Sequence, residues 1–216
     1  MKEVRAGRLS DPRPLDTKTA GAECLAPRYA LFEQHGGGPR KVRVVDDLRA
    51  SAADAITDMR GASIPDSMGV FSAVASYFRL LQPAREIRAS TDDFCHAYKN
   101  IVTPTENAPC AAVLLGPTAG LLMVSKLRTQ PFGSTRAPAN WGRVTALIQR
   151  VLITYFGAYL PIYVDDCFIV EPAETIHIAF LRTKLAIEMF GFELGGSQIP
   201  SRPINLLGAS ISRPSP

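Results

Sequence analysis

Apolar residues recur at helical spacing in three stretches of the 216-residue chain. Steps of three and four residues place side chains on one face, so each stretch predicts an amphipathic helix. The first ends near Pro83, and Pro138 is well placed in the first turn of the second. The three apolar stripes are Met68, Phe71, Val74, Phe78 and Leu81, then Trp141, Val144, Ile148, Val151 and Tyr155, and then Ile176, Phe180, Thr183, Ile187 and Phe190.

Short apolar runs bounded by turn residues predict strands at several further places. The runs 110–115 and 121–126 flank a Gly-Pro turn, which is typical of an antiparallel hairpin. Further strands are expected at 41–45, 87–91 and 204–212. Because strands and helices are mixed and the hairpins are antiparallel, the sequence indicates an α+β fold.

The domain boundaries follow from the same pattern. Residues 1–34 have scattered charges, three prolines and little periodicity, so we expect a poorly ordered N-terminal arm there. Residues 35–212 form the expected domain, and residues 213–216 a short tail.

Two adjacent carboxylates, Asp165 and Asp166, stand between the apolar runs Leu160 to Val164 and Cys167 to Val170. This arrangement predicts a hairpin whose turn presents both acids. Adjacent like charges there are costly unless a cation shares them, and a pair of carboxylates suits Mg²⁺. Taken alone, the same dipeptide is better explained as a solvated turn, and the rest of the chain must decide between the two.

Composition narrows the class of protein. A hydrophobic content of 46% allows a sizeable buried core. The longest apolar run, 151–164, is too short to span a membrane, and the N-terminus lacks the apolar segment of a signal peptide. We therefore expect an intracellular protein, cytoplasmic or nuclear, without a membrane partner. The four cysteines and three histidines show no metal-ligand spacing, which predicts reduced thiols and no zinc site.

Charge is distributed unevenly along the chain. Residues 107–164 contain no acid but carry five basic residues, so this tract of 58 residues has a charge of +5. An acid-free basic tract that ends at an acid pair favours a surface for polyanions beside a cation site. The alternative is a chance run of neutral residues in a core-rich segment. The basic residues are Lys126, Arg128, Arg136, Arg143 and Arg150, of which Arg128, Arg136 and Arg143 are our candidates for contact with nucleic acid.

Four segments, in order, resemble the reverse transcriptase family, particularly the enzymes of retroelements. Tyr163-Val164-Asp165-Asp166 is similar to its YxDD hairpin, and Asp93 to Tyr98 is similar to its first palm motif. Pro131 to Pro138 has the PFGxxxAP form, and Lys41 to Arg49 resembles the fingers strand that binds triphosphate. The segments Phe190 to Phe192 and Leu206 to Ile211 are weaker matches, so the resemblance covers roughly residues 40–212.

The resemblance implies a polymerase palm, with an antiparallel sheet backed by helices, and partial fingers. It implies RNA-directed DNA synthesis, in which dNTPs are added to the 3′-hydroxyl of a primer on an RNA or DNA template. Asp93, Asp165 and Asp166 would be the catalytic carboxylates and the ligands of two Mg²⁺ ions, with Mn²⁺ as a substitute.

The resemblance also implies a nucleotide site. Arg43, assisted by Arg40 or Lys41, would bind the triphosphate through its planar guanidinium. Tyr98 would lie beneath the sugar, where a ring disfavours a 2′-hydroxyl and so selects deoxynucleotides. Phe132 and Gly133 would line the pocket, with Gly133 letting backbone approach the nucleotide.

The chain also departs from the family pattern. The stretch Glu193 to Gln198 lacks the lysine that the family usually carries there, and Arg202 is a possible substitute. The thumb and the ribonuclease H segment are absent from the sequence, so we expect further domains of a longer polyprotein. Two alternatives stay open: an inactive, truncated relic that binds nucleic acid, and an RNA polymerase built on the same palm.

Overall fold

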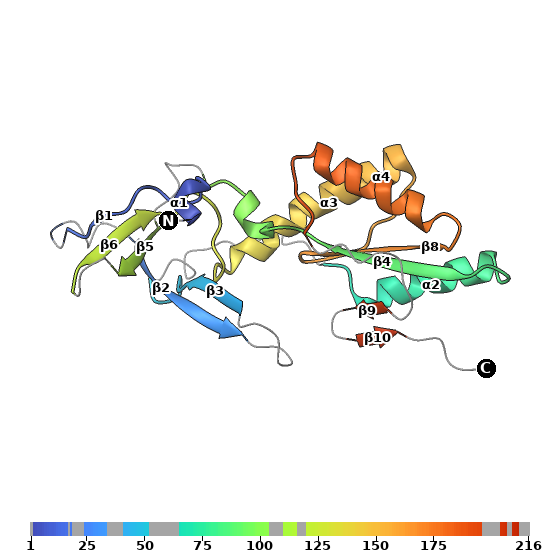
Figure 1. Ribbon diagram of the computed structural model, residues 1–216, viewed down its shortest axis with the longest axis horizontal. Coiled ribbons are helices and arrows are strands. Elements are labelled where there is room, and N and C mark those ends of the chain that lie inside the picture. The colour runs from blue at the N-terminus through green and yellow to red at the C-terminus, as the bar shows by residue number, and fades with distance from the viewer. Residues whose placement is uncertain are drawn as a thin grey trace. The chain divides into compact units, whose positions relative to one another are not determined.

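The computed structural model describes residues 2–16, 18, 24–33, 41–51, 65–103, 110–115, 120–195, 204–206 and 209–211 (Figure 1). The chain forms two compact units. Unit 1 combines Met1–Ala62 with Tyr98–Trp141, and unit 2 combines Ser63–Ala97 with Gly142–Pro216. The division passes through the short 3₁₀ helix η3 (Ala97–Asn100) and the long helix α3 (Arg136–Phe156). Each unit is described by itself.

Unit 1 contains a five-stranded sheet in the order β1-β6-β5-β2-β3. Its strands are β1 (Arg13–Pro14), β2 (Cys24–Glu33), β3 (Lys41–Asp46), β5 (Cys110–Leu115) and β6 (Leu122–Lys126). The strands β5 and β6 form the expected antiparallel hairpin. The pair β2 and β5 is parallel, which makes the sheet mixed.

Part of the N-terminal stretch, where we expected a poorly ordered arm, forms regular structure. It holds helix α1 (Lys2–Arg5), and its strand β2 has partners on both sides. Leu9 and Ala26 are buried in one cluster with Leu48 and Leu127. Pro27 lies within β2, opposite Val113 in the parallel register. Pro27, one of the three prolines that suggested an irregular segment, is therefore compatible with this strand, and the stretch supplies part of the core of unit 1.

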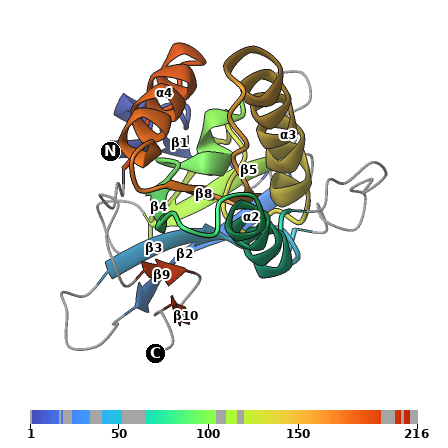
Figure 2. The ribbon, with the colours of Figure 1, turned by 90° about the vertical axis from the view of Figure 1, so that its right-hand side faces the viewer.

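Unit 2 contains a three-stranded antiparallel sheet in the order β4-β8-β7. The strands are β4 (Ile87–Asp93), β7 (Ile162–Tyr163) and β8 (Asp166–Pro172). Helix α2 (Met68–Leu81) packs on one face, where Phe71 clusters with Ala89, Phe168 and Val170. Helix α4 (Ile176–Met189) covers the other face (Figure 2). The α+β class and a sheet backed by helices are confirmed.

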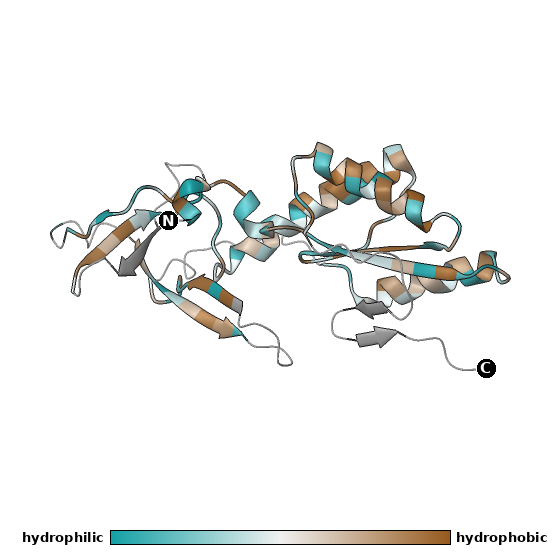
Figure 3. Ribbon diagram, in the orientation of Figure 1, coloured by the Kyte–Doolittle hydropathy of each residue, from teal (hydrophilic) through white to brown (hydrophobic). Residues whose placement is uncertain are grey.

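The helices match the sequence pattern in position but not fully in the face they bury. From Trp141 onward the buried positions of α3 are Trp141, Thr145, Ile148 and Leu152, whereas Tyr155, which we expected on the apolar stripe, is 78% exposed. The steps 141, 145, 148 and 152 have the same helical spacing, so periodicity alone could not choose between the two stripes. Apolar residues occur around most of α4 (Figure 3), and Leu181, Leu185 and Met189 are exposed.

The expected strand at 204–212 is two short strands instead. β9 (Ile204–Leu206) and β10 (Ala209–Ile211) pair antiparallel, with Ile204 opposite Ile211. Leu207 and Gly208 stand between them in sequence. A dipeptide with glycine between two apolar runs predicts a hairpin, whereas we interpreted it as the interior of one strand. Within the described ranges, no helix combines the length and apolarity needed to cross a membrane.

Candidate active site

The two adjacent acids lie in a tight hairpin of unit 2, as the sequence predicted. Strands β7 and β8 pair Ile162 with Cys167 and Tyr163 with Asp166, so Val164 and Asp165 form a two-residue loop. Ile162 and Cys167 are buried, which fixes the base of the hairpin in the core. The acids are therefore presented from a rigid support.

The loop of this hairpin is strained at Val164. Its φ is +57°, in the left-handed region that a β-branched residue rarely adopts. Asp165 has no positive φ, so the positive φ falls at the first position of the two-residue loop, where glycine is usual. The conformation costs about 1–2 kcal/mol. Strain of this kind persists only where the surroundings enforce it, and it is common at functional sites.

Asp93 stands directly opposite Asp166 in the antiparallel register of β4 and β8. Opposed residues share a face of the sheet, and alternation places both on the face that carries Phe168 and Val170. The Phe94 amide donates a hydrogen bond to the Asp165 carbonyl, at 2.9 Å. The three predicted catalytic acids therefore come from one end of one small sheet.

This end of the sheet is electrostatically negative. Burial raises the pKa of the Asp166 carboxyl above its usual range, and the adjacent Asp165 raises it further. Burial also raises the pKa of the Cys95 thiol, with further contributions from Glu193, Asp93 and Asp92. Neither Asp165 nor Asp166 forms an ion pair with any other described residue. A bound cation would relieve this repulsion.

The donor chemistry of the three acids suits Mg²⁺, which prefers carboxylate oxygens. Their side chains are nevertheless not gathered into a ready site. In the part of the chain that the structure describes, no three histidine, cysteine or acidic side chains lie close enough together to hold a metal ion.

A segment that was only a weak match packs against the end of β4. The Cys95 amide donates to the Glu193 carbonyl, and the Gly195 amide donates to the Asp93 carbonyl, both at 2.8 Å. The rings of Phe94 and Phe192 meet edge to face, with centroids 6.1 Å apart. The backbone on both sides of Asp93 is therefore fixed. The residues from Gly196 to Pro200, and Arg202, lie outside the described ranges.

Three of the predicted nucleotide-binding residues lie together in unit 1. The rings of Tyr98 and Phe132 meet edge to face at 5.5 Å, and the Lys99 ammonium lies 5.6 Å from the Phe132 centroid. Gly133 has φ +106°, and a Cβ there would collide with the Asp46 carbonyl oxygen. Gly133 therefore has a packing role next to the end of β3. A contact between Gly133 and a nucleotide stays a prediction.

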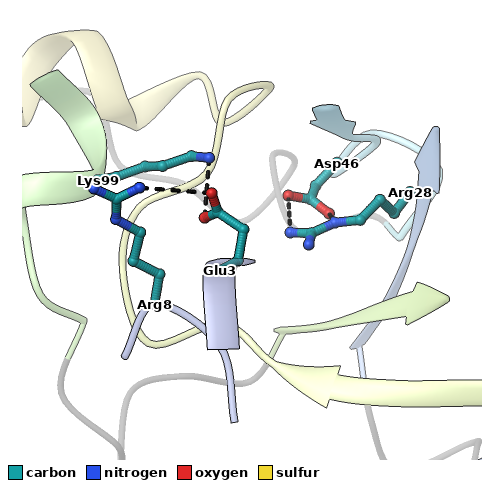
Figure 4. Close-up of polar contacts among 5 residues, drawn as sticks. All are labelled: Glu3, Arg8, Arg28, Asp46 and Lys99. Carbon is teal, nitrogen blue, oxygen red and sulfur yellow. Dashed lines mark hydrogen bonds and ion pairs between the residues drawn. The ribbon is translucent and has the colours of Figure 1, made fainter. Parts of the chain in front are cut away.

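Ion pairs connect the segments around these residues (Figure 4). The sequence did not predict these ion pairs. Arg28 binds the buried Asp46 carboxylate through two hydrogen bonds, at 2.7 and 2.8 Å. Glu3 of α1 binds Lys99 at 3.0 Å and Arg8 at 3.5 Å. Arg28 and Asp46 lie opposite each other in the register of β2 and β3, so recognising β2 as a strand would have revealed their proximity.

The predicted phosphate-binding and template-binding residues are less constrained. Arg43 lies on β3 with an exposed side chain that pairs with Glu33 at 2.8 Å. Lys41 begins the same strand, and its side chain is outside the description, as is Arg40. Arg128 and Arg136 belong to unit 1 and Arg143 to unit 2. Contacts of these six basic residues with phosphate stay predictions.

Unit 1 also has an open pocket of about 490 Å³ at the end of β3. Its lining is both polar and apolar, and it was not predicted as a pocket. It is lined by Tyr29, Val45, Asp46, Asp47, Arg49, Gly133, Ser134 and Thr135.

Comparisons with known proteins identify the fold. No family model and no curated protein matches the chain. Among solved structures, it is similar to a foamy viral protease-reverse transcriptase in complex with double-stranded DNA, with a TM-score of 0.66 and 20% identity over 97% of this chain. Two structures of the prototype foamy virus protease-reverse transcriptase give TM-scores of 0.65 and 0.69, at 16% and 15% identity over 99% of this chain.

At these identities the likeness establishes a reverse-transcriptase-like fold and nothing finer. The chain spans 32% of the first neighbour and 25% of the other two.

Proposed function

We propose that this chain is an RNA-directed DNA polymerase domain of a retroelement, which adds dNTPs to the 3′-hydroxyl of a primer. The observation that carries the proposal is the pairing of Asp93 with Asp166 across β4 and β8, beside the strained loop that holds Asp165. A strained turn that holds two like charges does not stabilise the fold. Strain of this kind is common at catalytic sites, where it helps to position the reacting groups. The reverse-transcriptase-like fold supports the same reaction class.

In this proposal Asp93, Asp165 and Asp166 hold two Mg²⁺ ions, for which Mn²⁺ can substitute. Bound Mg²⁺ would lower the pKa of the primer hydroxyl and neutralise charge on the leaving pyrophosphate. The backbone hydrogen bonds at Phe94 and Gly195 keep Asp93 and Asp165 in place for this task. Because this backbone is fixed, the acids would need only side-chain rotation to bind the metal ions.

Unit 1 would contribute substrate selection. We assign Tyr98 and Phe132 to the sugar of the incoming nucleotide, since their edge-to-face contact fixes both rings. Arg43 would exchange Glu33 for the triphosphate, with help from Lys41. A triphosphate competes well for this guanidinium, because the pair with Glu33 is largely exposed to solvent.

Template and primer would be bound by the basic tract that includes Arg128, Arg136 and Arg143. A solved neighbour is a complex with double-stranded DNA, which is consistent with this assignment. We assign unit 2 to the palm and unit 1 to the fingers. A thumb and a ribonuclease H domain would complete the enzyme in a longer polyprotein.

Primer extension on an RNA template with dNTPs and Mg²⁺, repeated with Mn²⁺, tests the proposal. We expect Asp93→Asn and Asp166→Asn to lower extension by roughly 100-fold to 1,000-fold, as removal of other charge-stabilising groups does. Glu171→Gln, an acid change on the same strand β8, is the matched control. Extension that is equal in all variants would contradict the assignment. Equal use of rNTPs and dNTPs by the unaltered chain would favour an RNA polymerase and contradict the role of Tyr98.

A second candidate is nucleic-acid binding without catalysis, by an inactive relic of the enzyme. One observation favours it: among the described residues, the acids do not form a cluster ready for a metal. This candidate predicts salt-dependent binding of primer–template with no incorporation in either metal. Incorporation that requires Asp166 would eliminate it.

A further inference from the structure

The hairpin that carries the acids has little support from its own strand pairing. Strand β7 has only two residues and lies at the edge of the sheet, where β8 is its single neighbour. The Phe94 amide holds the inner side of the loop through the Asp165 carbonyl. The outer side of β7 would be an open strand edge without a further partner.

Asp66, just before α2, occupies that outer edge. The Ile162 amide donates to the Asp66 carboxylate at 2.9 Å, and the Asp66 amide donates to the Ile162 carbonyl at 3.1 Å. Both backbone groups of Ile162 therefore point away from β8. This pattern fits the register of the hairpin. Tyr163 and Asp166 form the hydrogen-bonded pair that closes the two-residue loop, so the next pair, Ile162 and Cys167, is a non-hydrogen-bonded pair.

Gln149 of α3 fixes the Asp66 carboxylate in this position. Its amide nitrogen donates to the same carboxylate oxygen, at 2.5 Å, and to the Leu160 carbonyl at 2.8 Å. A single side-chain amide therefore ties the segment before α2 to the residues that lead into β7. Tyr159 is close enough for Asp66 to act on it electrostatically: burial first, and then the Asp66 charge, raises the pKa of its hydroxyl.

We infer that Asp66 and Gln149 are positioning residues that set the geometry of the carboxylate hairpin. We call them the Asp66–Gln149 clamp. The clamp lies at Ile162, only three residues before Asp165, and the loop between them is the strained one. A strained loop relaxes when its supports are removed, so loss of the clamp lets the loop that holds Asp165 relax and Asp166 leave its register opposite Asp93. This inference rests on the proposed function for its effect on metal binding, but not for its effect on the hairpin.

Two measurements on the full chain test the clamp. The first is hydrogen exchange of the Ile162 amide without metal, compared with the Ile169 amide in the middle of β8. The second is Mn²⁺ affinity, measured by electron paramagnetic resonance. The variants are Asp66→Ala and Gln149→Met, with Asp66→Asn as the conservative change that keeps an oxygen acceptor for Ile162. Gln82→Met is the matched control, a glutamine of unit 2 at the end of α2.

We expect Asp66→Ala and Gln149→Met to speed exchange at Ile162 about tenfold or more, while Ile169 is unchanged. Mn²⁺ affinity should fall about tenfold, the lower end of the range for groups that orient metal ligands. Asp66→Asn should exchange like the unaltered chain at Ile162. A general loss of stability would accelerate Ile169 as well, which separates a positioning role from a merely structural one.

The clamp is overturned if Asp66→Ala and Gln149→Met match Gln82→Met at Ile162. If Asp66→Ala does not fold, Gln149→Met compared with Gln82→Met decides the question. An unaltered chain that binds no Mn²⁺ contradicts the proposed function instead, and the exchange data still test the clamp by themselves.

Discussion

Three paired acids of unit 1 and the two hairpin acids of unit 2 lie in opposite electrostatic settings. In unit 1 Asp46, Glu3 and Glu33 each have a cationic partner within 3.0 Å. In unit 2 Asp165 and Asp166 are adjacent, no described cation pairs with them, and the pKa of Asp166 is raised. Carboxylates therefore stabilise the fold where they have a cationic partner, and destabilise it where they are adjacent without one.

This difference separates structural acids from candidate catalytic acids. A paired carboxylate strengthens the fold only as long as it stays ionised and its partner stays in place. Carboxylates that lie close together without a cation repel each other and destabilise the fold. A catalytic role would explain why the protein has them. Substitutions of the paired acids of unit 1 and of Asp166 should therefore change the free energy of unfolding in opposite directions.

The largest loss should come from Asp46→Asn in unit 1. Asp46 is 2% exposed and binds Arg28 through both carboxylate oxygens, so its removal leaves a largely buried guanidinium without its counter-charge. We expect the free energy of unfolding to fall by about 3–5 kcal/mol in urea denaturation. Glu33→Gln, which breaks the exposed pair with Arg43, should cost less than about 1 kcal/mol. Equal losses would remove the distinction between buried and exposed pairs.

Gly133→Ala should be nearly as destabilising. The left-handed backbone costs an L-residue about 1–2 kcal/mol, and the collision with the Asp46 carbonyl adds about 1–3 kcal/mol. Gly7→Ala is the matched control, because Gly7 has φ +70° but open space around its Cα. It should show the backbone cost alone. If both variants lose the same stability by urea denaturation, the close packing of Gly133 is unimportant.

Glu3→Gln should cost about 1 kcal/mol at pH 7, in a pH-dependent way. Burial alone would raise the pKa of Glu3, but the hydrogen bond and charge of Lys99, together with Arg8 and Arg28, lower it below its ordinary value of 4.5. A carboxyl with a lowered pKa stabilises the fold above its ordinary pKa and loses that contribution as the pH falls through the lowered one. Thermal unfolding at several pH values should therefore show the two proteins converging in acid. A constant difference would contradict the ion-pair network.

The smallest effect has the opposite sign. Asp166→Asn should raise the free energy of unfolding at pH 7 by about 0.5–1 kcal/mol, because it removes one of two crowded charges. Because the pKa of Asp166 is raised in the folded protein, its ionised form destabilises the fold when the pH is above that pKa. The carboxyl of the unaltered chain becomes protonated as the pH falls below the ordinary carboxyl range, so the stability advantage of the variant should vanish there. Thermal unfolding measures both. A loss of stability at pH 7 would mean that Asp166 has a structural partner.

The sequence predicted those features that are written in contiguous residues. The hairpin at Asp165 was found because short apolar runs flank its acids, and the strand expected at 87–91 extends to Asp93 in the structure. Strand β2 was missed because Pro27 and its charged neighbours conceal a strand whose parallel partner, β5, begins 86 residues after it.

Contacts between distant residues could not be predicted in the same way. Asp66 is 83 residues from Gln149 and 96 from Ile162, and nothing local in the sequence marks Asp66 or Gln149 as a partner of the hairpin. The packing role of Gly133 likewise depends on Asp46, far along the chain. Local patterns therefore located the candidate catalytic residues, whereas the residues that position them required the fold.

Mn²⁺ binding to the unaltered chain, Asp166→Asn and Glu171→Gln tests the contrast between the two kinds of acid most directly. Glu171 lies on the same strand as Asp166 but is bound to Thr175. If the carboxylate hairpin exists to hold a divalent cation, the unaltered chain and Glu171→Gln will bind Mn²⁺ with equal affinity, and Asp166→Asn will bind it at least tenfold more weakly. Equal binding by all three proteins, or no binding by any, would contradict the assignment of these acids to a metal site.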